Sequence, residues 1–187
     1  MNPGKIVFLN GTSSSGKTSL AHALQDSLEE PYLEAGLDKF IFMLPKRYLD
    51  RPLWDEVLGL ADHAGGEGHV LVSGMHAAIA SLAMKGNNVI ADHVLVEPAW
   101  ARECAVLFAD LPAYLVGVRC PLDVLEQRER SRGNRTLGQA RLQYNLVHKY
   151  VNYDLEVDTS ILSPEACAGE IKKRLRTRPE AFKKLRG

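Results

Sequence analysis

The sequence predicts an α/β fold in which a parallel sheet is flanked by helices. Five short apolar runs have the length and composition of buried strands, at residues 6–9, 32–37, 89–92, 113–118 and 155–157. Stretches with helical spacing separate successive runs, and strands that are joined through helices pair in parallel. The 187 residues are 45% hydrophobic and 25% charged, which is typical of a globular chain with a substantial core. We therefore expect one domain that spans residues 1–187.

The first predicted strand leads directly into a glycine-rich motif. After Ile6 to Leu9 the chain reads Gly11-Thr12-Ser13-Ser14-Ser15-Gly16-Lys17-Thr18, which matches Gly-x-x-x-x-Gly-Lys-Ser/Thr at every fixed position. Leu20, Leu24 and Leu28 then recur at helical spacing. A strand, a glycine loop and a helix in this order are the context that a P-loop requires, whereas a chance Gly/Ser-rich turn is the alternative. The context favours nucleotide binding and a P-loop NTPase fold.

The residue types of this motif suit a polyphosphate. Gly11 and Gly16 allow a close backbone approach, so that successive N–H groups can point at an anion beside a helix N-terminus. Lys17 adds a mobile positive charge for the β and γ phosphates, and the Thr18 hydroxyl can ligate Mg²⁺. We therefore expect ATP and Mg²⁺ as cofactors. The predicted nucleotide-binding residues are Gly11, Thr12, Ser13, Ser14, Ser15, Gly16, Lys17, Thr18 and Ser19.

Two aspartates follow predicted strands. Asp38 comes after the strand at 32–37, where a carboxylate could accept the proton of an attacking hydroxyl or could cap the helix that begins there. The residue pattern alone leaves both roles of Asp38 open. Asp92 ends the third strand, and the P-loop upstream favours a metal ligand there over a capping or turn residue. His93 beside it is either a substrate contact or an ordinary loop histidine.

Helical patterns and turns fill the remaining chain. Gly65, Gly66 and Gly68 suggest a turn or loop, and residues 73–85 predict a helix closed by Gly86. Further helices are predicted over 100–108, 123–131 and 137–150. Ser163 and Pro164 read as the cap and first turn of a last helix.

An arginine-rich segment lies at 127–136. Its basic residues and Gly133 suit a lid that closes over the phosphates, where an arginine neutralises the charge that develops on the transferred group. The alternative is a solvated helix face that pairs with Glu126 and Glu129. The arginines of this segment are Arg128, Arg130, Arg132 and Arg135, and we favour a catalytic role for at least one of them.

Charge and cysteine content limit the other classes of function. Basic and acidic residues both number 23, which does not suggest a nucleic-acid binder. From Lys172 onward there are eight basic residues and one acid, which we expect to form a solvated, partly frayed helix end rather than a binding patch. The three cysteines show no zinc or disulfide spacing, so reduced thiols in a cytoplasmic protein are the simplest account. No signal-peptide pattern or membrane-length apolar run is present.

Several stretches, in matching order and spacing, resemble a known family. They are Ile6 to Thr18, Pro31 to Leu33, Gly36 to Asp38, Met43 to Pro45, Val89 to Asp92, Val116 to Cys120, Arg128-Glu129, Arg132 to Arg135, Val147-His148 and Tyr153 to Thr159. With these residues the chain resembles the chloramphenicol 3-O-phosphotransferase family. That family is a branch of the P-loop kinases and is similar in fold to shikimate and adenylate kinases.

The resemblance implies a five-stranded parallel sheet and an ATP- and Mg²⁺-dependent transfer of phosphate to a hydroxyl of a small molecule, such as a chloramphenicol-like antibiotic. Asp38 stands where the family has its catalytic base, and Arg132 and Arg135 where lid arginines meet ATP. The family's third strand ends in two aspartates, whereas this chain has Asp92 and His93.

Residues 38–85 form the expected acceptor region, although the part from 46 to 72 matches the family poorly. The alternatives are a kinase of another small metabolite or of a nucleoside or nucleic-acid hydroxyl, and an ATP-binding switch module without an acceptor. The oligomeric state, a homo-oligomer included, stays open.

Overall fold

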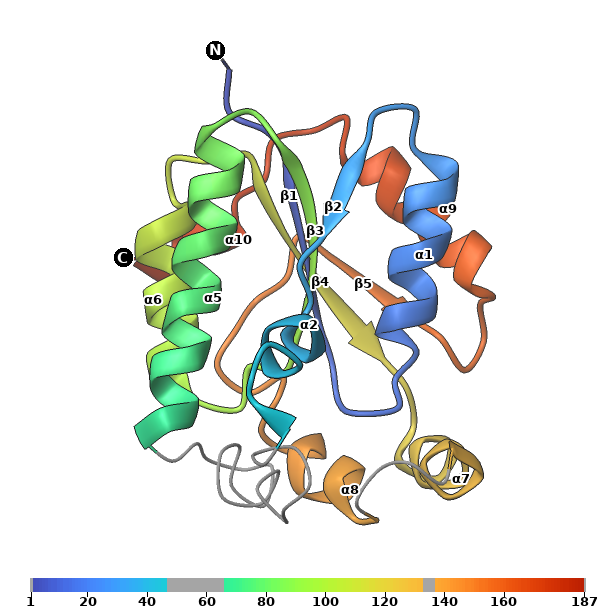
Figure 1. The fold of residues 1–187 in the computed structure, drawn as a ribbon. Coiled ribbons are helices and arrows are strands. Elements are labelled where there is room, and N and C mark those ends of the chain that lie inside the picture. Colours follow the sequence, from blue (N-terminus) through green and yellow to red (C-terminus); the bar gives the residue numbers. More distant parts are fainter. Residues whose placement is uncertain (1, 47–65, 133–136, 187) are drawn as a thin grey trace.

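The central strand β1 (Ile6–Asn10) pairs in parallel with β3 (Asn88–His93) on one side and β4 (Ala113–Arg119) on the other. The outer strands β2 (Tyr32–Glu34) and β5 (Leu155–Asp158) complete a five-stranded sheet of order β2-β3-β1-β4-β5. The computed structural model describes residues 2–46, 66–132 and 137–186. The predicted parallel sheet flanked by helices is thus confirmed (Figure 1).

Helices cover both faces of the sheet (Figure 1). Helices α1 (Lys17–Ser27) and α9 (Pro164–Arg174) lie on one face, and α5 (Gly66–Met84), α6 (Pro98–Phe108) and α10 (Ala181–Arg186) lie on the other. Side chains of β1 alternate between two buried clusters, because successive residues of a strand point to opposite faces. Ile6 and Phe8 pack toward α5 and α6, whereas Val7 and Leu9 pack toward α1 and α9. All four are fully buried, which explains the continuous apolar run.

The carboxyl ends of the five strands meet at one edge of the sheet, as they must in a parallel sheet. Of the described helices, α2 (Leu37–Ile41) lies there directly after β2, and α7 (Leu122–Arg132) and α8 (Gln139–Tyr144) lie there between β4 and β5 (Figure 1). The glycine loop leaves β1 at the middle of this edge. Residues that follow different strands can therefore converge on the loop.

Three predicted element boundaries are corrected. The second strand ends at Glu34 rather than at residue 37, because the chain has already turned into α2 at Leu37. Gly66 and Gly68 belong to α5 instead of a turn, since packing of this helix against the sheet and α6 outweighs the poor helix propensity of glycine. Gly65 lies outside the described residues. The helix expected over 137–150 is shorter than predicted: it is α8, which ends at Tyr144. It begins directly after Gly138, whose backbone adopts the left-handed conformation.

The cysteines are unpaired, and all three lie in the core. Burial raises the pKa of the Cys104, Cys120 and Cys167 thiols, which therefore stay protonated at neutral pH. In the described part of the chain, no three His, Cys, Asp or Glu side chains form a cluster that could hold a metal ion. None of the helices described there combines the length and apolar character needed to cross a membrane.

The C-terminal residues are not a frayed helix end, which corrects the expectation from their charge. They form α10, whose Phe182 is 2% exposed and packs edge-on against Phe8 and Phe108 at centroid distances of 5.8 and 5.3 Å. The Asp154 carboxylate holds the helix start by accepting hydrogen bonds from the backbone N–H groups of Glu180 and Ala181. A single aromatic residue in a basic stretch thus places this segment in the core.

Replacing Phe182 with Ala is expected to lower the free energy of unfolding by about 3–5 kcal/mol, because it leaves a cavity between the sheet and α10. Chemical denaturation followed by circular dichroism measures this loss. Lys183→Ala is the matched control in the same helix, since Lys183 is exposed and its truncation should change stability by less than about 0.5 kcal/mol. Equal stability of the two variants would show that α10 contributes nothing to the core.

Candidate functional site

The loop from Gly11 to Thr18 has the backbone of a phosphate cradle. Ser14 and Gly16 both adopt the left-handed conformation, with φ of 63° and 86°, and Gly16 caps α1. A Cβ on Gly11 would lie only 2.6 Å from the Val118 carbonyl oxygen, so the residue must be glycine. The loop therefore curls around the N-terminus of α1, where backbone N–H groups and the helix dipole attract an anion.

Polar side chains of the loop are prepared for a ligand. Lys17 is 8% exposed, and its Nζ donates hydrogen bonds across the loop to the carbonyl oxygens of Gly11 at 2.9 Å and Thr12 at 2.7 Å. The hydroxyls of Ser14 and Ser15 are buried and have no hydrogen-bond partner among the described residues. A buried hydroxyl without a partner is costly. Ser14 lines the cavity beside the loop, where a phosphate oxygen would give its hydroxyl a partner, so the loop fits a nucleotide.

Thr18 and Asp92, the two predicted metal ligands, lie together. The Thr18 hydroxyl donates to Asp92 Oδ2 at 3.1 Å, across 74 positions of sequence. Burial raises the pKa of Asp92 above its usual value, the nearby Lys17 ammonium acts in the opposite direction, and Asp38 raises it further. A hydroxyl and a carboxylate side by side fit Mg²⁺, which binds one or two such oxygens and completes its coordination with phosphate and water oxygens.

Asp38 lies at the same end of the sheet. Gly36, not Asp38, caps α2, so a capping role for Asp38 is wrong; it is instead the second residue of that helix. A Cβ on Gly36 would be 2.6 Å from Asp92 Oδ1, which shows how closely the start of α2 approaches Asp92. The charge of Asp38 also acts on the pKa of Asp92. Asp92, bonded to Thr18, thus lies within electrostatic range of both Lys17 and Asp38, at the end of the sheet where β1, β2 and β3 finish.

His93 does not face this group. Its ring is fully buried and stacks on Phe8 at a centroid distance of 5.4 Å, on the α5 and α6 side of the sheet. His93 Nε2 lies 3.1 Å from His76 Nε2, and its Nδ1 accepts a hydrogen bond from the Val94 N–H at 2.8 Å. A role for His93 as a substrate contact is therefore wrong for this conformation, because protein atoms occupy both ring nitrogens.

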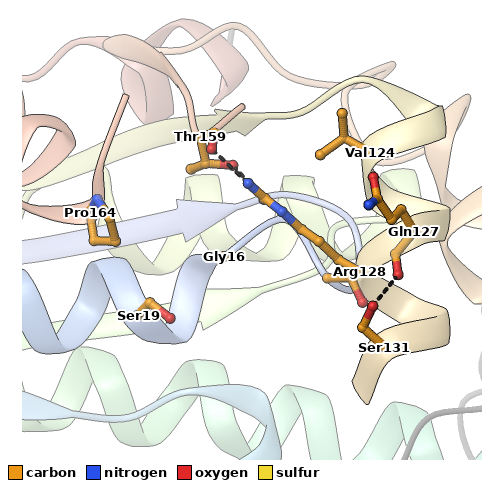
Figure 2. A pocket seen from close by; sticks show the side chains of 9 residues that line it. Gly16, Ser19, Val124, Gln127, Arg128, Ser131, Thr159 and Pro164 are labelled. Atoms are coloured by element: carbon orange, nitrogen blue, oxygen red, sulfur yellow. Dashed lines mark hydrogen bonds between the residues drawn. The ribbon is translucent and has the colours of Figure 1, made fainter. Parts of the chain in front are cut away.

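Arg128 lies on the other side of the loop from Asp38. Its guanidinium donates to the carbonyl oxygen of Thr159 at 2.7 Å and to the Thr159 hydroxyl at 3.1 Å (Figure 2). The Thr159 hydroxyl in turn donates to the carbonyl oxygen of Ser15 at 2.7 Å. Arg128 is thereby tied to the P-loop through the residue that follows β5. A catalytic role for Arg128 stays a prediction, and these contacts favour nucleotide binding instead.

These residues line a cavity of about 500 Å³ beside the loop (Figure 2). Arg128 extends across it, while Ser19 and Pro164 lie on the opposite wall (Figure 2). The cavity has more apolar than polar lining, which suits a flat aromatic base next to a phosphate cradle. Its walls are formed by Ser14, Gly16, Ser19, Val124, Gln127, Arg128, Ser131, Thr159 and Pro164.

Two buried residues near the P-loop, one that holds the loop and one that joins α7 to α8, were not among the predicted site residues. Gln143 of α8 is 7% exposed, and its Oε1 accepts a hydrogen bond from the backbone N–H of Ser13 at 2.6 Å. Glu129 of α7 is 2% exposed and accepts from the N–H groups of Gly138 and Ala140 at 2.8 and 3.0 Å. Glu129 therefore joins α7 to α8 instead of pairing with an arginine on a solvated face. Gln143 lies in none of the predicted motifs, and Glu129 was considered only as an ion-pair partner on a solvated helix face. The fold alone brings the two residues to these partners.

The arginine segment is partly described. Arg132 ends α7, and its side chain is not described. Arg135 and Gly133 lie outside the described residues, as do residues 47–65 of the predicted acceptor region. The roles of Arg132 and Arg135, and the extent of both regions, stay predictions.

The chain was compared with families of known proteins. The family model described as "Chloramphenicol phosphotransferase-like protein" matches residues 4–176. The chain belongs to this family. Two strains of Mycobacterium tuberculosis have relatives named "Putative O-phosphotransferase", each 35% identical over 201 residues, covering 100% of this chain and 89% of the relative. As a member of the chloramphenicol phosphotransferase-like family, the protein is a phosphotransferase.

Solved structures confirm the fold. The APS kinase CysC of Mycobacterium tuberculosis, solved with AMPPNP and APS, has a TM-score of 0.64 at 18% identity, covering 95% of this chain and 100% of that one. A gluconokinase from Sinorhizobium meliloti has a TM-score of 0.58 at 16% identity, covering 93% and 96% of the two chains. At these identities the likeness shows the P-loop kinase fold and leaves the acceptor open.

Proposed function

We propose that the protein transfers the γ-phosphate of ATP, with Mg²⁺, to a hydroxyl of a small molecule that resembles chloramphenicol. The observation that supports the proposal is the close approach of the start of α2 to Asp92, because α2 carries Asp38, whose charge acts on Asp92, and because Asp38 does not line the cavity. A carboxylate on that side is suited to an acceptor hydroxyl rather than to the nucleotide.

The strand order supports one orientation of the nucleotide. The cavity with Arg128 and Thr159 lies at the ends of β4 and β5. Asp38 follows β2, and Asp92 lies at the end of β3, on the other side of β1. A base in the cavity would direct the polyphosphate along the P-loop toward Thr18. In this orientation Lys17 meets the terminal phosphates, and Thr18 with Asp92 would hold Mg²⁺, which neutralises charge on the phosphate oxygens.

The residues divide the chemistry between them. Asp38 orients the acceptor hydroxyl and accepts its proton while the hydroxyl oxygen bonds to the γ-phosphorus and the bond to the β–γ bridging oxygen breaks. ADP leaves, and the acceptor carries the phosphate. The value of Asp38 lies more in positioning than in basicity, because phosphoryl transfer has a loose transition state. Arg132 and Arg135 would close over the phosphates and exclude water.

An acceptor panel tests the proposal. The purified protein is incubated with ATP and Mg²⁺ and with chloramphenicol, a sugar acid, a nucleoside or a 5′-hydroxyl oligonucleotide. Acceptor-stimulated ADP release and phosphorus NMR of the product are then measured. We expect chloramphenicol, or another aromatic compound whose side chain carries a primary alcohol, to stimulate ADP release well above the rate with ATP alone.

The other outcomes separate the alternatives. If only the sugar acid or the nucleoside is phosphorylated, the physiological acceptor is another metabolite rather than an antibiotic that resembles chloramphenicol. ATP binding without transfer to any acceptor would indicate a switch module. Phosphorylation of the oligonucleotide would indicate a nucleic-acid kinase, in which the basic C-terminal residues would bind the acceptor. These cannot be deleted without removing Phe182 from the core, so the exposed Arg176, Arg178 and Lys183 should be changed to Gln instead.

A further inference from the structure

A chain of buried polar side chains links α6 and α5 to the end of β3. His93 of β3 contacts His76 of α5 through their Nε2 atoms at 3.1 Å, and His76 Nδ1 lies 2.7 Å from Glu103 Oε2 on α6. Ser73 donates a hydrogen bond to the second oxygen of Glu103. Both histidine rings are fully buried, whereas the Glu103 side chain is 31% exposed.

The hydrogen bonds of this chain can run in only one direction. His93 Nδ1 accepts from the backbone N–H of Val94, so the proton of this neutral ring is on Nε2. His93 therefore donates to His76 Nε2, which must be an acceptor, and His76 donates from Nδ1 to the Glu103 carboxylate. Burial lowers the pKa of both histidines, in agreement with two neutral rings. Every ring nitrogen has one partner and one role.

Such a chain is expensive to bury and must be kept complete. Phe8 stacks on His93, and Trp100 packs edge-on against it at a centroid distance of 5.6 Å, so apolar side chains surround the pair. In such surroundings a polar side chain that loses its partner is destabilising, and a complete network fixes one arrangement of the groups. The ring of His93 is thereby held in a single orientation.

The orientation of His93 affects the site because its backbone is joined to both Asp92 and the start of the P-loop. His93 follows Asp92 in β3, and neighbouring side chains of a strand point to opposite faces. His93 is anchored on the α5 and α6 face, and Asp92 reaches Thr18 on the other side. The carbonyl oxygen of His93 also accepts the hydrogen bond of the Gly11 N–H, at 3.3 Å, where the P-loop begins. A twist at His93 would move both Asp92 and the start of the loop.

We infer that Glu103 and His76 are positioning residues that hold the end of β3, through His93, so that the Asp92 carboxylate is aligned for the metal. This inference rests on the proposed function in one respect, namely that Asp92 meets Mg²⁺ when nucleotide is bound. Groups that orient a metal ligand from behind typically change metal affinity by about 10- to 100-fold when they are removed.

Two substitutions at His76 separate positioning from packing. Asn places its amide near the position of Nδ1 and keeps the bond to Glu103, but it does not reach His93. Gln places its amide near the position of Nε2 and restores an acceptor for His93. We expect His76→Asn to weaken Mn²⁺ binding in the presence of ADP by about 10-fold, and His76→Gln to stay within about threefold of the wild type. Electron paramagnetic resonance of free Mn²⁺ measures this affinity without catalysis.

Two further variants complete the design. Glu103→Ala removes the outer, partly exposed end of the chain and is expected to fold even if His76→Asn does not; it should weaken Mn²⁺ binding by about threefold, less than His76→Asn, because like His76→Gln it loses only the bond between His76 and Glu103. Tyr114→Phe is the matched control, because Tyr114 is 4% exposed and its hydroxyl donates to Leu175 and Thr177 carbonyls far from the P-loop. It should lower the melting temperature without changing Mn²⁺ affinity.

The outcomes separate this inference from the proposed function. Unchanged Mn²⁺ affinity in folded His76→Asn, or in Glu103→Ala if the first does not fold, would overturn the inference while the wild type still binds Mn²⁺ with ADP. A wild type that binds no Mn²⁺ with ADP would overturn the metal role of Asp92 and the inference with it. Weaker binding in both variants, rescue by Gln and no change in Tyr114→Phe would support it.

Discussion

Asp38→Asn is expected to reduce kcat by about 10²- to 10⁴-fold and to leave the affinity for ATP nearly unchanged. The amide keeps the shape of the side chain but has one oxygen acceptor instead of two and no negative charge, so it neither orients the acceptor hydroxyl as a carboxylate does nor accepts its proton. Asp38 lies beside Asp92 and away from the cavity for the base, so its loss should not disturb the nucleotide. Steady-state kinetics with saturating acceptor and calorimetry with a non-hydrolysable ATP analogue measure the two quantities.

Glu34→Gln is the control for Asp38→Asn. Glu34 ends β2, pairs with Lys39 at 3.2 Å, and like Asp38 raises the pKa of Asp92. Its neutralisation therefore removes a similar negative charge near Asp92 without removing a base. We expect kcat to fall by less than about threefold, as for a partly exposed ion pair. Equal losses of kcat in the two variants would mean that Asp38 acts only through the electrostatic effect of its charge on Asp92. Normal turnover in Asp38→Asn would eliminate its role as base.

Lys17→Met is expected to lower kcat/KM by about 10²- to 10³-fold, because it removes the positive charge that meets the terminal phosphates. Met keeps the length and apolar stem of the side chain. Lys17 is nearly buried in the wild type, and its ammonium group donates to two carbonyl oxygens and offsets the charge of Asp92, so its replacement leaves these groups without a partner. The melting temperature without ligand should therefore fall below that of the wild type, which thermal denaturation can test.

Lys172→Met provides the comparison for Lys17→Met. Lys172 also donates from Nζ to a main-chain carbonyl, that of Ser27 at 2.7 Å, but it joins α9 to the end of α1. Its replacement should leave kcat/KM within about twofold, as expected for a surface substitution. A similar loss of activity in both variants would point to a general effect of basic charge, as the nucleic-acid alternative requires. Normal kcat/KM in Lys17→Met would contradict phosphate binding by this loop.

The P-loop and the sheet could be predicted because each depends on neighbours in sequence. Gly11, Gly16 and Lys17 lie within one short stretch, and the backbone conformation that they require is local. A short apolar run predicted each strand, because the side chains of a central parallel strand are buried on both faces of the sheet. The same local logic correctly identified Ser163 as the cap of α9, where its hydroxyl accepts from the Ala166 N–H at 3.2 Å.

Predictions from composition alone failed where a distant contact was decisive. The basic C-terminal stretch was expected to be frayed, yet Phe182 anchors it to Phe8 at the other end of the chain. His93 was expected either at the substrate or in a loop, yet His76, which is itself bonded to Glu103, contacts it on the opposite face of the sheet. In both cases one side chain gains a buried partner, and that gain outweighs the local pattern.

The sequence by itself determined the fold class, the phosphate cradle and the candidate residues at the strand ends, because periodicity and backbone conformation are properties of short segments. Only the tertiary structure decided which groups meet. Thr18 and Asp92 are 74 positions apart, and Ser15 and Thr159 are 144 positions apart, yet each pair shares a hydrogen bond. The physical reason is that a parallel sheet brings the ends of all its strands to one edge, and the strand order then sets Asp38 on one side of the P-loop and Arg128 on the other.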